Sequence, residues 1–339
     1  MKLTKQLSIV ITIILAIYSI IPVVHAFSKK MEEKKDREYH YSFRSDQTAI
    51  LEKYEGSVSE CIIPQEINGY TVVEIGDHAF EGNRFLRSIS IPDTVERIGE
   101  SAFSDCYFLQ TVSFGKGIRE IGSLAFYSDY ALRSVNLPNC ITAIRQQAFQ
   151  YCHHLQMVDL GEELQTLGAA AFACCFQLKE IAIPEPISVI PDKAFMYCYQ
   201  LQRVTLPEEI TRIGSDAFTA CACLRVDRLP DSLEIIDHDA FEECLSLREM
   251  QMPASLQKIE QGAFANCSSR LSFVTTKGSN AGRYAEGKIT VRYTDTGETI
   301  SMPNAVWHDI FSYSQFFVQT FFYNIPGIVI SKVVNIVLR

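Results

Sequence analysis

The sequence lacks an excess of basic residues and lacks the short motifs that mark common enzymes. Its 339 residues include 31 Lys and Arg against 40 Asp and Glu, a formal net charge of -9. A general nucleic-acid binder needs a basic surface to release phosphate counterions, so the charge disfavours that class. There is also no Gly-x-Ser-x-Gly, no His-Glu-x-x-His and no phosphate-binding glycine loop. We therefore expect no enzymatic activity, no cofactor and no nucleic-acid partner.

What the chain does contain is a repeat of 23 residues. Phenylalanine, each time preceded by alanine, recurs at this spacing, at Phe80, Phe103, Phe126, Phe149, Phe172, Phe195, Phe218, Phe241 and Phe264. Self-similarity at such a period is typical of a solenoid, in which each unit buries its apolar surface against its neighbours. Nine and eleven residues after most of these phenylalanines stand two apolar residues, as in Ile181 and Ile183. This alternation predicts a short strand, which Pro or Gly then ends.

The repeat can be written Leu-x-x-Ile-x-Leu-Pro-x-x-Ile-x-x-Ile-Gly-x-x-Ala-Phe-x-x-Cys-x-x. It resembles the BspA-type leucine-rich repeat proteins, a class with 23-residue repeats found on bacterial surfaces, over roughly Tyr39 to Tyr293. The resemblance implies an α/β repeat solenoid with a parallel β-sheet on the concave face and short turns or helical segments on the convex face. It also implies a non-enzymatic surface protein that binds proteins or glycans.

The sequence divides into six segments. We expect a signal peptide at 1–26, a charged tether at 27–38, an N-terminal cap with the first rung at 39–76, the repeat solenoid at 77–273, a closing segment at 274–296 and a hydrophobic aromatic tail at 297–339. The signal is indicated by Lys2 and Lys5, an apolar run from 7 to 24, and Val24-His25-Ala26, which suits signal peptidase. An uncleaved anchor is the alternative, and either predicts an extracellular or cell-surface protein.

The tail differs from the repeats. Residues 310–331 carry no formal charge and are long enough to span a bilayer. Polar residues dilute this segment and Pro326-Gly327 divides it, so an aromatic hairpin that packs on the solenoid or lies at a membrane interface is an equally physical interpretation.

The cysteines follow the repeat more than they follow a disulfide pattern. Seven of the 11 stand three residues after a repeat phenylalanine, beside an inward leucine: Cys106, Cys152, Cys175, Cys198, Cys221, Cys244 and Cys267. We interpret them as reduced, small packing residues, and Cys61, Cys140, Cys174 and Cys223 as the better candidates for oxidation. Cys152, His153 and His154 lie one repeat from Cys174 and Cys175, but no Cys-x-x-Cys spacing supports zinc, and we expect no metal site.

Recognition is expected along two columns of the repeat. Seven residues after each phenylalanine stand cations or glutamines: Arg87, Gln110, Arg133, Gln156, Lys179, Gln202, Arg225 and Arg248. Four residues after it stand Tyr107, Tyr130, His153, Phe176 and Tyr199. Aromatic residues and arginines concentrate binding energy at interfaces. We propose as ligand-binding candidates Tyr107, Tyr130, Phe176, Tyr199, Arg87, Arg133, Lys179, Gln202, Arg225 and Arg248. The alternative is that these outward positions merely repeat residues that suit a solvent-exposed surface.

Beyond each strand, an acidic edge carries residues such as Asp93, Glu208 and Glu209, which we interpret as solvated. One rung departs from the pattern, because Asp227 stands where earlier repeats have an apolar residue. A buried unpaired carboxylate is costly, so this rung should bulge or pair Asp227 with an arginine.

The sequence thus predicts an exported adhesin-like protein that binds a protein or glycan along an extended face. The alternative is a spacer whose tail, through residues 310–331, mediates membrane association or assembly.

Overall fold

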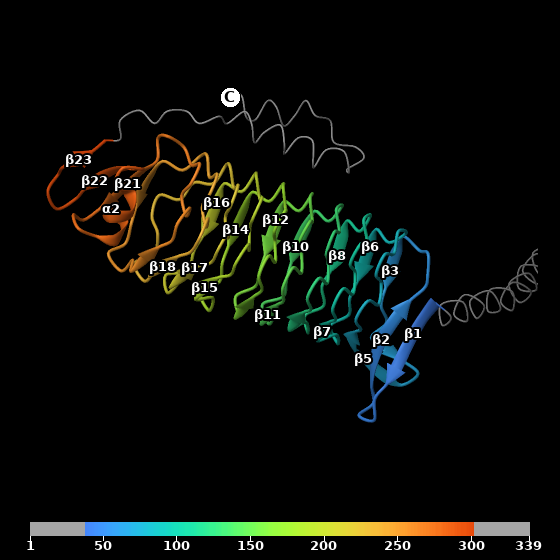
Figure 1. The fold of residues 1–339 in the computed structure, drawn as a ribbon. Helices are drawn as coiled ribbons and strands as arrows, with labels where there is room; N and C mark the ends of the chain where they lie inside the picture. Colours follow the sequence, from blue (N-terminus) through green and yellow to red (C-terminus); the bar gives the residue numbers. More distant parts are fainter. Residues whose placement is uncertain (1–37, 302–339) are drawn as a thin grey trace, which may run out of the picture. The chain divides into compact units, whose positions relative to one another are not determined.

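The computed structural model describes residues 38–301. The predicted signal peptide, nearly all of the tether, and the tail from residue 302 onward lie outside the described residues, so those expectations stay predictions. Residues 38–301 form a β-solenoid whose coils stack side by side (Figure 1). Each repeat makes one coil, because parallel pairing joins residues 23 positions apart, as in Ser88 with Thr111 and Glu180 with Arg203.

One series of parallel strands, here called the main ladder, is made of the short segments predicted from the apolar alternation. Their inward residues are buried, as with Ile89 and Ile181, or partly buried, as with Val158, and in these strands the residues on either side are more exposed. The strands are β3 (Glu60–Ile62), β6 (Ser88–Ser90), β8 (Thr111–Ser113), β10 (Ser134–Asn136), β12 (Met157–Asp159), β14 (Glu180–Ala182), β16 (Arg203–Thr205), β19 (Glu249–Gln251) and β21 (Ser272–Thr275).

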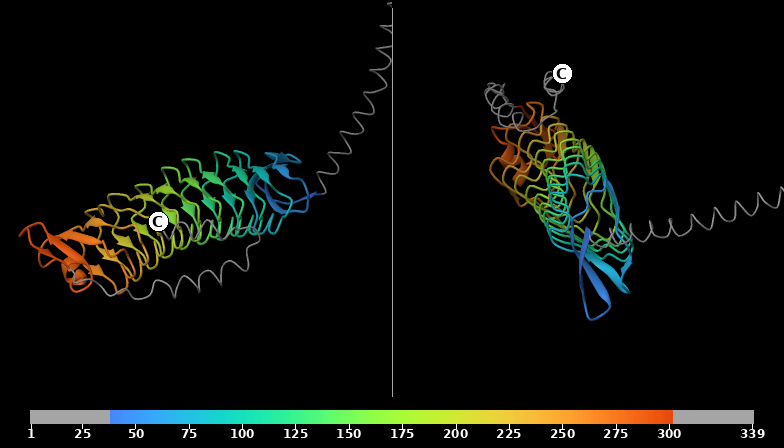
Figure 2. Two further views of the ribbon diagram at one scale, coloured as in Figure 1. Left: turned by 90° about the horizontal axis from the view of Figure 1, so that it is seen from above. Right: turned by 90° about the vertical axis from the view of Figure 1, so that its right-hand side faces the viewer.

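A second ladder of parallel strands lies on the other side of each coil, apart from the main ladder in both views (Figures 1 and 2). It is formed where the second apolar pair of each repeat approaches the next Ala-Phe. Its strands are β5 (Tyr70–Ile75), β7 (Arg97–Ile98), β9 (Glu120–Ile121), β11 (Ala143–Ile144), β13 (Thr166–Leu167), β15 (Val189–Ile190), β17 (Arg212–Ile213), β18 (Ile235–Ile236) and β20 (Lys258–Ile259).

Antiparallel elements close the two ends of the described solenoid. At the start, β1 (Tyr39–Phe43) pairs with β2 (Thr48–Tyr54), and β4 (Glu66–Ile67) pairs with β5. At the end, α2 (Asn280–Ala285) is followed by β22 (Thr290–Tyr293), which pairs with β21 and with the antiparallel β23 (Thr299–Ile300). These pairings cover strand edges that would otherwise invite another chain.

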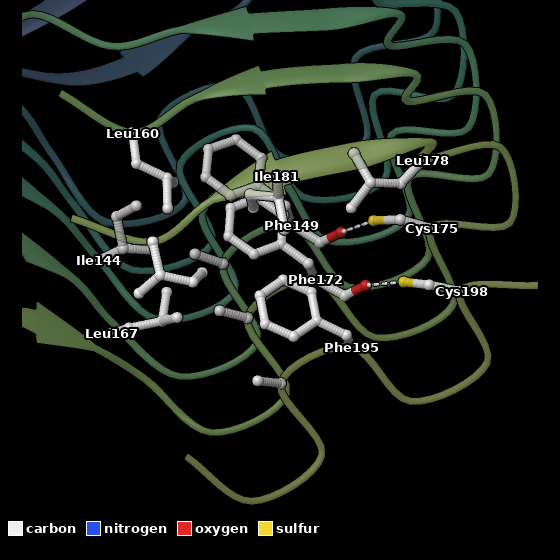
Figure 3. Packing of buried hydrophobic residues seen from close by; sticks show 14 of the residues in the cluster. Ile144, Phe149, Leu160, Leu167, Phe172, Cys175, Leu178, Ile181, Phe195 and Cys198 are labelled. Carbon is white, nitrogen blue, oxygen red and sulfur yellow. Dashed lines mark hydrogen bonds between the residues drawn. The ribbon is translucent and has the colours of Figure 1, made fainter. Parts of the chain in front are cut away.

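The repeat phenylalanines form a continuous stack through the core (Figure 3). Successive rings from Phe80 to Phe264 lie 4.9–5.9 Å apart, with interplanar angles of 0–19°. Tyr54 packs on the first ring at 5.0 Å, and Phe273 packs edge-on against the last at 5.0 Å. Each ring therefore has an aromatic neighbour on both sides, and the core is one column.

The turns around Ala-Phe contain no helix, so the predicted helical segments on the convex face are wrong. Two residues per repeat have left-handed backbone, two positions before and two after the phenylalanine, as with Ser101 (φ 51°) and Asp105 (φ 61°) around Phe103. A left-handed residue in each half of the turn prevents a run of helical dihedrals. The chain instead makes successive i to i+3 turns, such as Cys106 N–H to Phe103 C=O at 3.1 Å.

These turns carry a third hydrogen-bonded series, here called the turn ladder. The backbone N–H of each repeat phenylalanine from Phe80 to Phe241 donates to the carbonyl of the alanine in the next repeat, at 2.7–2.9 Å. In contrast, the main ladder is interrupted between β8 and β10 and between β16 and β19, and the second ladder between β13 and β15. Among the described residues, the turn ladder is thus the series that links all the repeats.

The ladder cysteines reinforce these turns. Each of the seven thiols donates to the carbonyl oxygen of the phenylalanine one repeat earlier, at 3.0–3.3 Å. Two of these bonds, from Cys175 and Cys198, are drawn in Figure 3. The residues are therefore hydrogen-bond donors as well as packing residues. Of the four cysteines named as better candidates for oxidation, Cys61 and Cys174 are buried and Cys140 and Cys223 are partly exposed, and their oxidation stays a prediction.

Gly122, which follows β9, lies against the backbone of the previous coil. At Gly122 an added Cβ would lie 2.6 Å from the carbonyl carbon of Gly99 in the previous repeat. The left-handed turn residue comes two positions later, at Leu124 (φ 58°). Gly122 therefore permits close approach of two coils, and the reversal of the chain is made by other residues.

Candidate functional site

The candidate residues lie along one edge of the main ladder. Since all its strands run parallel, the positions just before them meet at one edge. We call the positions four, five and seven residues after each repeat phenylalanine, from Arg84 to Arg248, the edge strip; they contain no Asp or Glu. The acidic residues predicted at the opposite edge, such as Asp93 and Glu208, follow the strands and are exposed. The fold therefore separates positive from negative charge across the main ladder.

The aromatic candidates form a stack of their own within the edge strip. Tyr107 and Tyr130 lie 5.0 Å apart, Tyr130 and His153 4.6 Å, His153 and Phe176 4.4 Å, and Phe176 and Tyr199 5.3 Å. In each of these four pairs the two ring planes lie within 29° of parallel. Because each inner ring covers the faces of its neighbours, a partner meets mainly ring edges and tyrosine hydroxyls. Stacking on a ring face, as sugars often do, is restricted here.

His153 is the buried centre of this stack. Its relative exposure is 7 %, and its Nε2 has no hydrogen-bond partner among the described residues. Burial, with a smaller effect from His154, lowers the pKa of His153 to about 4. The imidazole is therefore neutral near pH 7 and serves as a flat ring. The sequence pattern predicted that His153 belongs to the aromatic column, but it did not predict that its ring is buried.

The cationic candidates are exposed and lack carboxylate partners. Within residues 38–301, Arg87, Arg133, Lys179, Arg225 and Arg248 make no ion pair with Asp or Glu. By contrast, ion pairs occur along the second ladder, for example Arg145 with Glu120 at 3.0 Å and Arg212 with Asp237 at 2.6 Å. The charge of the edge strip is therefore available to an anionic partner.

The cations differ in how they are held. The Arg87 guanidinium lies 5.8 Å from the centroid of the Phe108 ring, an exposed aromatic that the sequence reasoning did not select. Arg248 donates through Nη1 to the carbonyl oxygens of Leu245 and Leu247, at 3.0 and 2.8 Å. Both contacts orient the side chain without neutralising it, since neither an aromatic ring nor a carbonyl carries a formal charge. Gln202, the remaining candidate, is exposed in the same row.

A hollow lies where the main ladder is interrupted. Val226 takes the buried position, Asp227 is exposed, and only an isolated bridge from Arg228 to Gln251 joins this rung to β19. Where a bulge or an arginine partner for Asp227 was expected, the strand pairing is interrupted and Asp227 faces outward. The arginine Arg228 pairs with Asp231 at 2.5 Å. The hollow has a volume of about 330 Å³ and is lined by Arg225, Val226, Asp227, Ser246 and Arg248.

A second buried titratable group stands in the cysteine column. Asp129 is fully buried; its Oδ1 accepts from the Cys106 N–H at 2.9 Å, and its Oδ2 has no hydrogen-bond partner among the described residues. Burial raises the pKa of this carboxyl well above its usual range. A carboxyl group thus replaces a thiol in the buried core.

The part of the chain that the structure describes has neither a cluster of metal ligands nor a membrane-spanning helix. Across residues 38–301, no three side chains of His, Cys, Asp or Glu come together as metal ligands, including those around Cys152 and Cys174. In the same residues no helix is long and apolar enough to cross a membrane. The segment 310–331, for which membrane association was predicted, lies outside them.

The chain is similar to known leucine-rich repeat proteins. The profile of the BspA type leucine rich repeat region matches residues 73–202 and 188–285, in six copies. Among solved structures, the Treponema pallidum leucine rich repeat protein is 29 % identical, with a TM-score of 0.53, over 56 % of this chain and 88 % of that one. No curated protein was found to match.

Two more distant structures are similar in part. A leucine rich cell surface protein from Faecalibacterium prausnitzii is 22 % identical, over 73 % of this chain and 95 % of that one, with a TM-score of 0.33. The pneumococcal vaccine antigen PcpA is 18 % identical, over 70 % of this chain and 79 % of that one, with a TM-score of 0.39.

Proposed function

Since the chain belongs to the BspA-type leucine-rich repeat family, we propose that it is an exported, non-catalytic protein that binds an extended macromolecule along the edge strip. The observation that supports this most is the row of exposed cations without carboxylate partners in residues 38–301: Arg87, Arg133, Lys179, Arg225 and Arg248. Soluble proteins usually intersperse charges of both signs on their surfaces. A one-sign row therefore favours an interaction.

A linear partner fits this surface better than a compact one. The edge strip repeats its side chains once per coil, and adjacent rings in it lie 4.4–5.3 Å apart. A cation or a glutamine stands at every step of this row, so that polar contacts accumulate along the partner. A partner of this kind is a glycan chain or an extended protein segment.

A binding role without chemistry follows from the placement of the perturbed groups. Asp129 and His153 have pKa values shifted as catalytic groups often do, but both side chains are buried. The hollow beside Asp227 contains arginines and a carboxylate, but no nucleophile paired with a base. Export is supported by the N-terminal sequence, where Lys2 and Lys5 precede the apolar run.

The test is capture on arrays of extracellular glycans and matrix proteins, using the full mature chain. Arg133→Gln with Lys179→Gln should weaken binding of any captured ligand about tenfold or more, because two charge-assisted contacts are lost. The matched control is Glu208→Gln with Glu209→Gln at the acidic edge, which should leave binding unchanged. If the acidic-edge variant is the one that loses the ligand, recognition lies on the opposite edge and the proposal is wrong.

A further inference from the structure

The cations of the edge strip have a period of two coils. In the row that precedes the strands, Arg87, Arg133, Lys179 and Arg225 alternate with Gln110, Gln156 and Gln202. The repeat itself requires only one unit per coil, so a doubled period in charge is not needed for folding. It is a property of the surface alone.

The structure sets the length of this period. Each coil is joined to the next in parallel register, 23 residues on, and core rings one coil apart are separated by 4.9–5.9 Å. Strands in a sheet are ~4.8 Å apart, so the cations recur at ~10 Å. Glutamine, with an amide that can both donate and accept, stands halfway between them.

Polymers differ in how their charges match this spacing. A residue of extended peptide advances ~3.3 Å, so three residues cover the ~10 Å period, and a peptide matches the cations only if an acidic residue stands at every third position. Each strand of DNA carries a phosphate every ~3.4 Å, far more densely than the cations are placed. A pyranose in an extended polysaccharide advances by about the length of one coil. An acidic sugar that alternates with a neutral one therefore places its carboxylates at the period of the cations.

We propose that the edge strip binds an extended polysaccharide in which acidic and neutral sugars alternate. The acidic sugars face Arg87, Arg133, Lys179 and Arg225, and the neutral sugars face the intervening glutamines. The proposal rests on the function proposed above and specifies its ligand. The alternation ends at the hollow, where Arg225 and Arg248 stand on consecutive coils, so the matched segment runs from Arg87 to Arg225.

The experiment compares four soluble probes on the full mature chain by surface binding at low salt. They are a polymer of alternating glucuronic acid and N-acetylglucosamine, polygalacturonic acid with an acid on every sugar, a neutral N-acetylglucosamine oligomer, and polyglutamate. The alternating polymer should bind at least about tenfold more tightly than each of the others, because it alone matches both charge and spacing.

Variants test the register directly. Arg133→Gln with Lys179→Gln should weaken binding of the alternating polymer at least tenfold. The control Arg119→Gln, an exposed arginine beside the second ladder that also lacks a carboxylate partner in residues 38–301, should not. Adding a cation to an intermediate coil, Gln156→Arg, should shift the preference towards polygalacturonic acid.

The outcomes separate this inference from the broader function. If polygalacturonic acid or polyglutamate binds the parent protein as well as the alternating polymer does, the period does not select the ligand and the inference is overturned. If no probe binds, but array capture finds a ligand that depends on Arg133 and Lys179, the inference fails while the proposed function stands. If no ligand depends on the edge strip, both fail.

Discussion

The thiol of Cys175 donates a hydrogen bond to the carbonyl oxygen of Phe149, at 3.3 Å (Figure 3). The same carbonyl accepts the N–H of Cys152 within its own turn, at 3.3 Å. A carbonyl oxygen has two lone pairs, so the two donors satisfy it completely inside the core. The cysteine column thereby joins each turn to the one before it.

Thiol reactivity should therefore separate the cysteines. Burial raises the pKa of Cys175 and Cys198 well above the usual range, and the thiolate is the reactive form. Native alkylation followed by mass spectrometry should modify the partly exposed Cys140 and Cys223, and should modify Cys175 at least about a hundredfold more slowly, since it needs local opening. Equal rates, or a bridge between neighbouring ladder cysteines in the exported protein, would contradict the packing role.

The aromatic core predicts a large cost for its central ring. Phe172→Ala should destabilise the protein by about 3–5 kcal/mol, because a fully buried side chain with a ring on each side is replaced by a cavity. Phe85→Ala is the matched control, since that ring is 59 % exposed, and it should cost less than about 1 kcal/mol. Denaturant unfolding measures both. Similar small losses would show that the stack does not hold the coils together.

The buried carboxyl of Asp129 should make the folded protein less stable as the pH rises above the pKa of an unfolded Asp. Its pKa is raised in the folded protein by burial, whereas an unfolded Asp titrates near ~3.9, so the folded state holds the proton more strongly. Stability then falls as the pH rises above that unfolded value. Asp129→Cys restores the residue of the other repeats, and should stabilise by about 1–3 kcal/mol at pH 8 and by less at pH 5. Glu208→Gln, at an exposed carboxylate, is the control. A gain independent of pH would show that Asp129 does not titrate as argued.

His153 predicts the opposite dependence. Burial lowers its pKa to about 4, below the ~6.5 of an unfolded histidine, so the unfolded state binds the proton more readily. Its contribution is present above the unfolded pKa and is lost as the pH falls towards 4. His153→Tyr, which copies Tyr130 in the column, should remove about 2 kcal/mol of the stability lost between pH 7.5 and pH 5. The exposed His238→Gln should behave as the parent, and identical pH profiles for all three proteins would exclude this role.

Much of the fold was predictable because buried positions must repeat when coils stack. Phe172, Cys175 and Ile181 are all buried, and their columns predicted the core and the main ladder. The turns were not predictable in this way, because left-handed backbone is held here by residues as different as Ser101 and Leu124. Neither has the side chain that usually signals that conformation, so helical segments were a natural but wrong expectation.

The candidate surface was predictable by column but not by depth. Arg133 and Lys179 are exposed, as their pattern indicated, whereas His153 in the aromatic column is interior. How deeply a side chain is buried depends on how each ring covers the next one. That packing cannot be read from a single sequence. At the rung of Asp227 the sequence predicted either a bulge or an arginine partner, because an unpaired charge is costly at an inward apolar position, and the structure interrupts the strand pairing there.

The unbroken turn ladder has a consequence for how such a protein can change over generations. Hydrogen bonds between the Ala-Phe turns link every repeat from Phe80 to Phe264, while the strands of the main ladder lose their pairing at two places without loss of the stack. Substitutions at the outward positions of the strands and beside them are therefore expected to leave the stack intact. Over generations, the Ala-Phe side of the coil is thus the more constrained side, and the outward positions beside the main ladder are the ones with more freedom to vary.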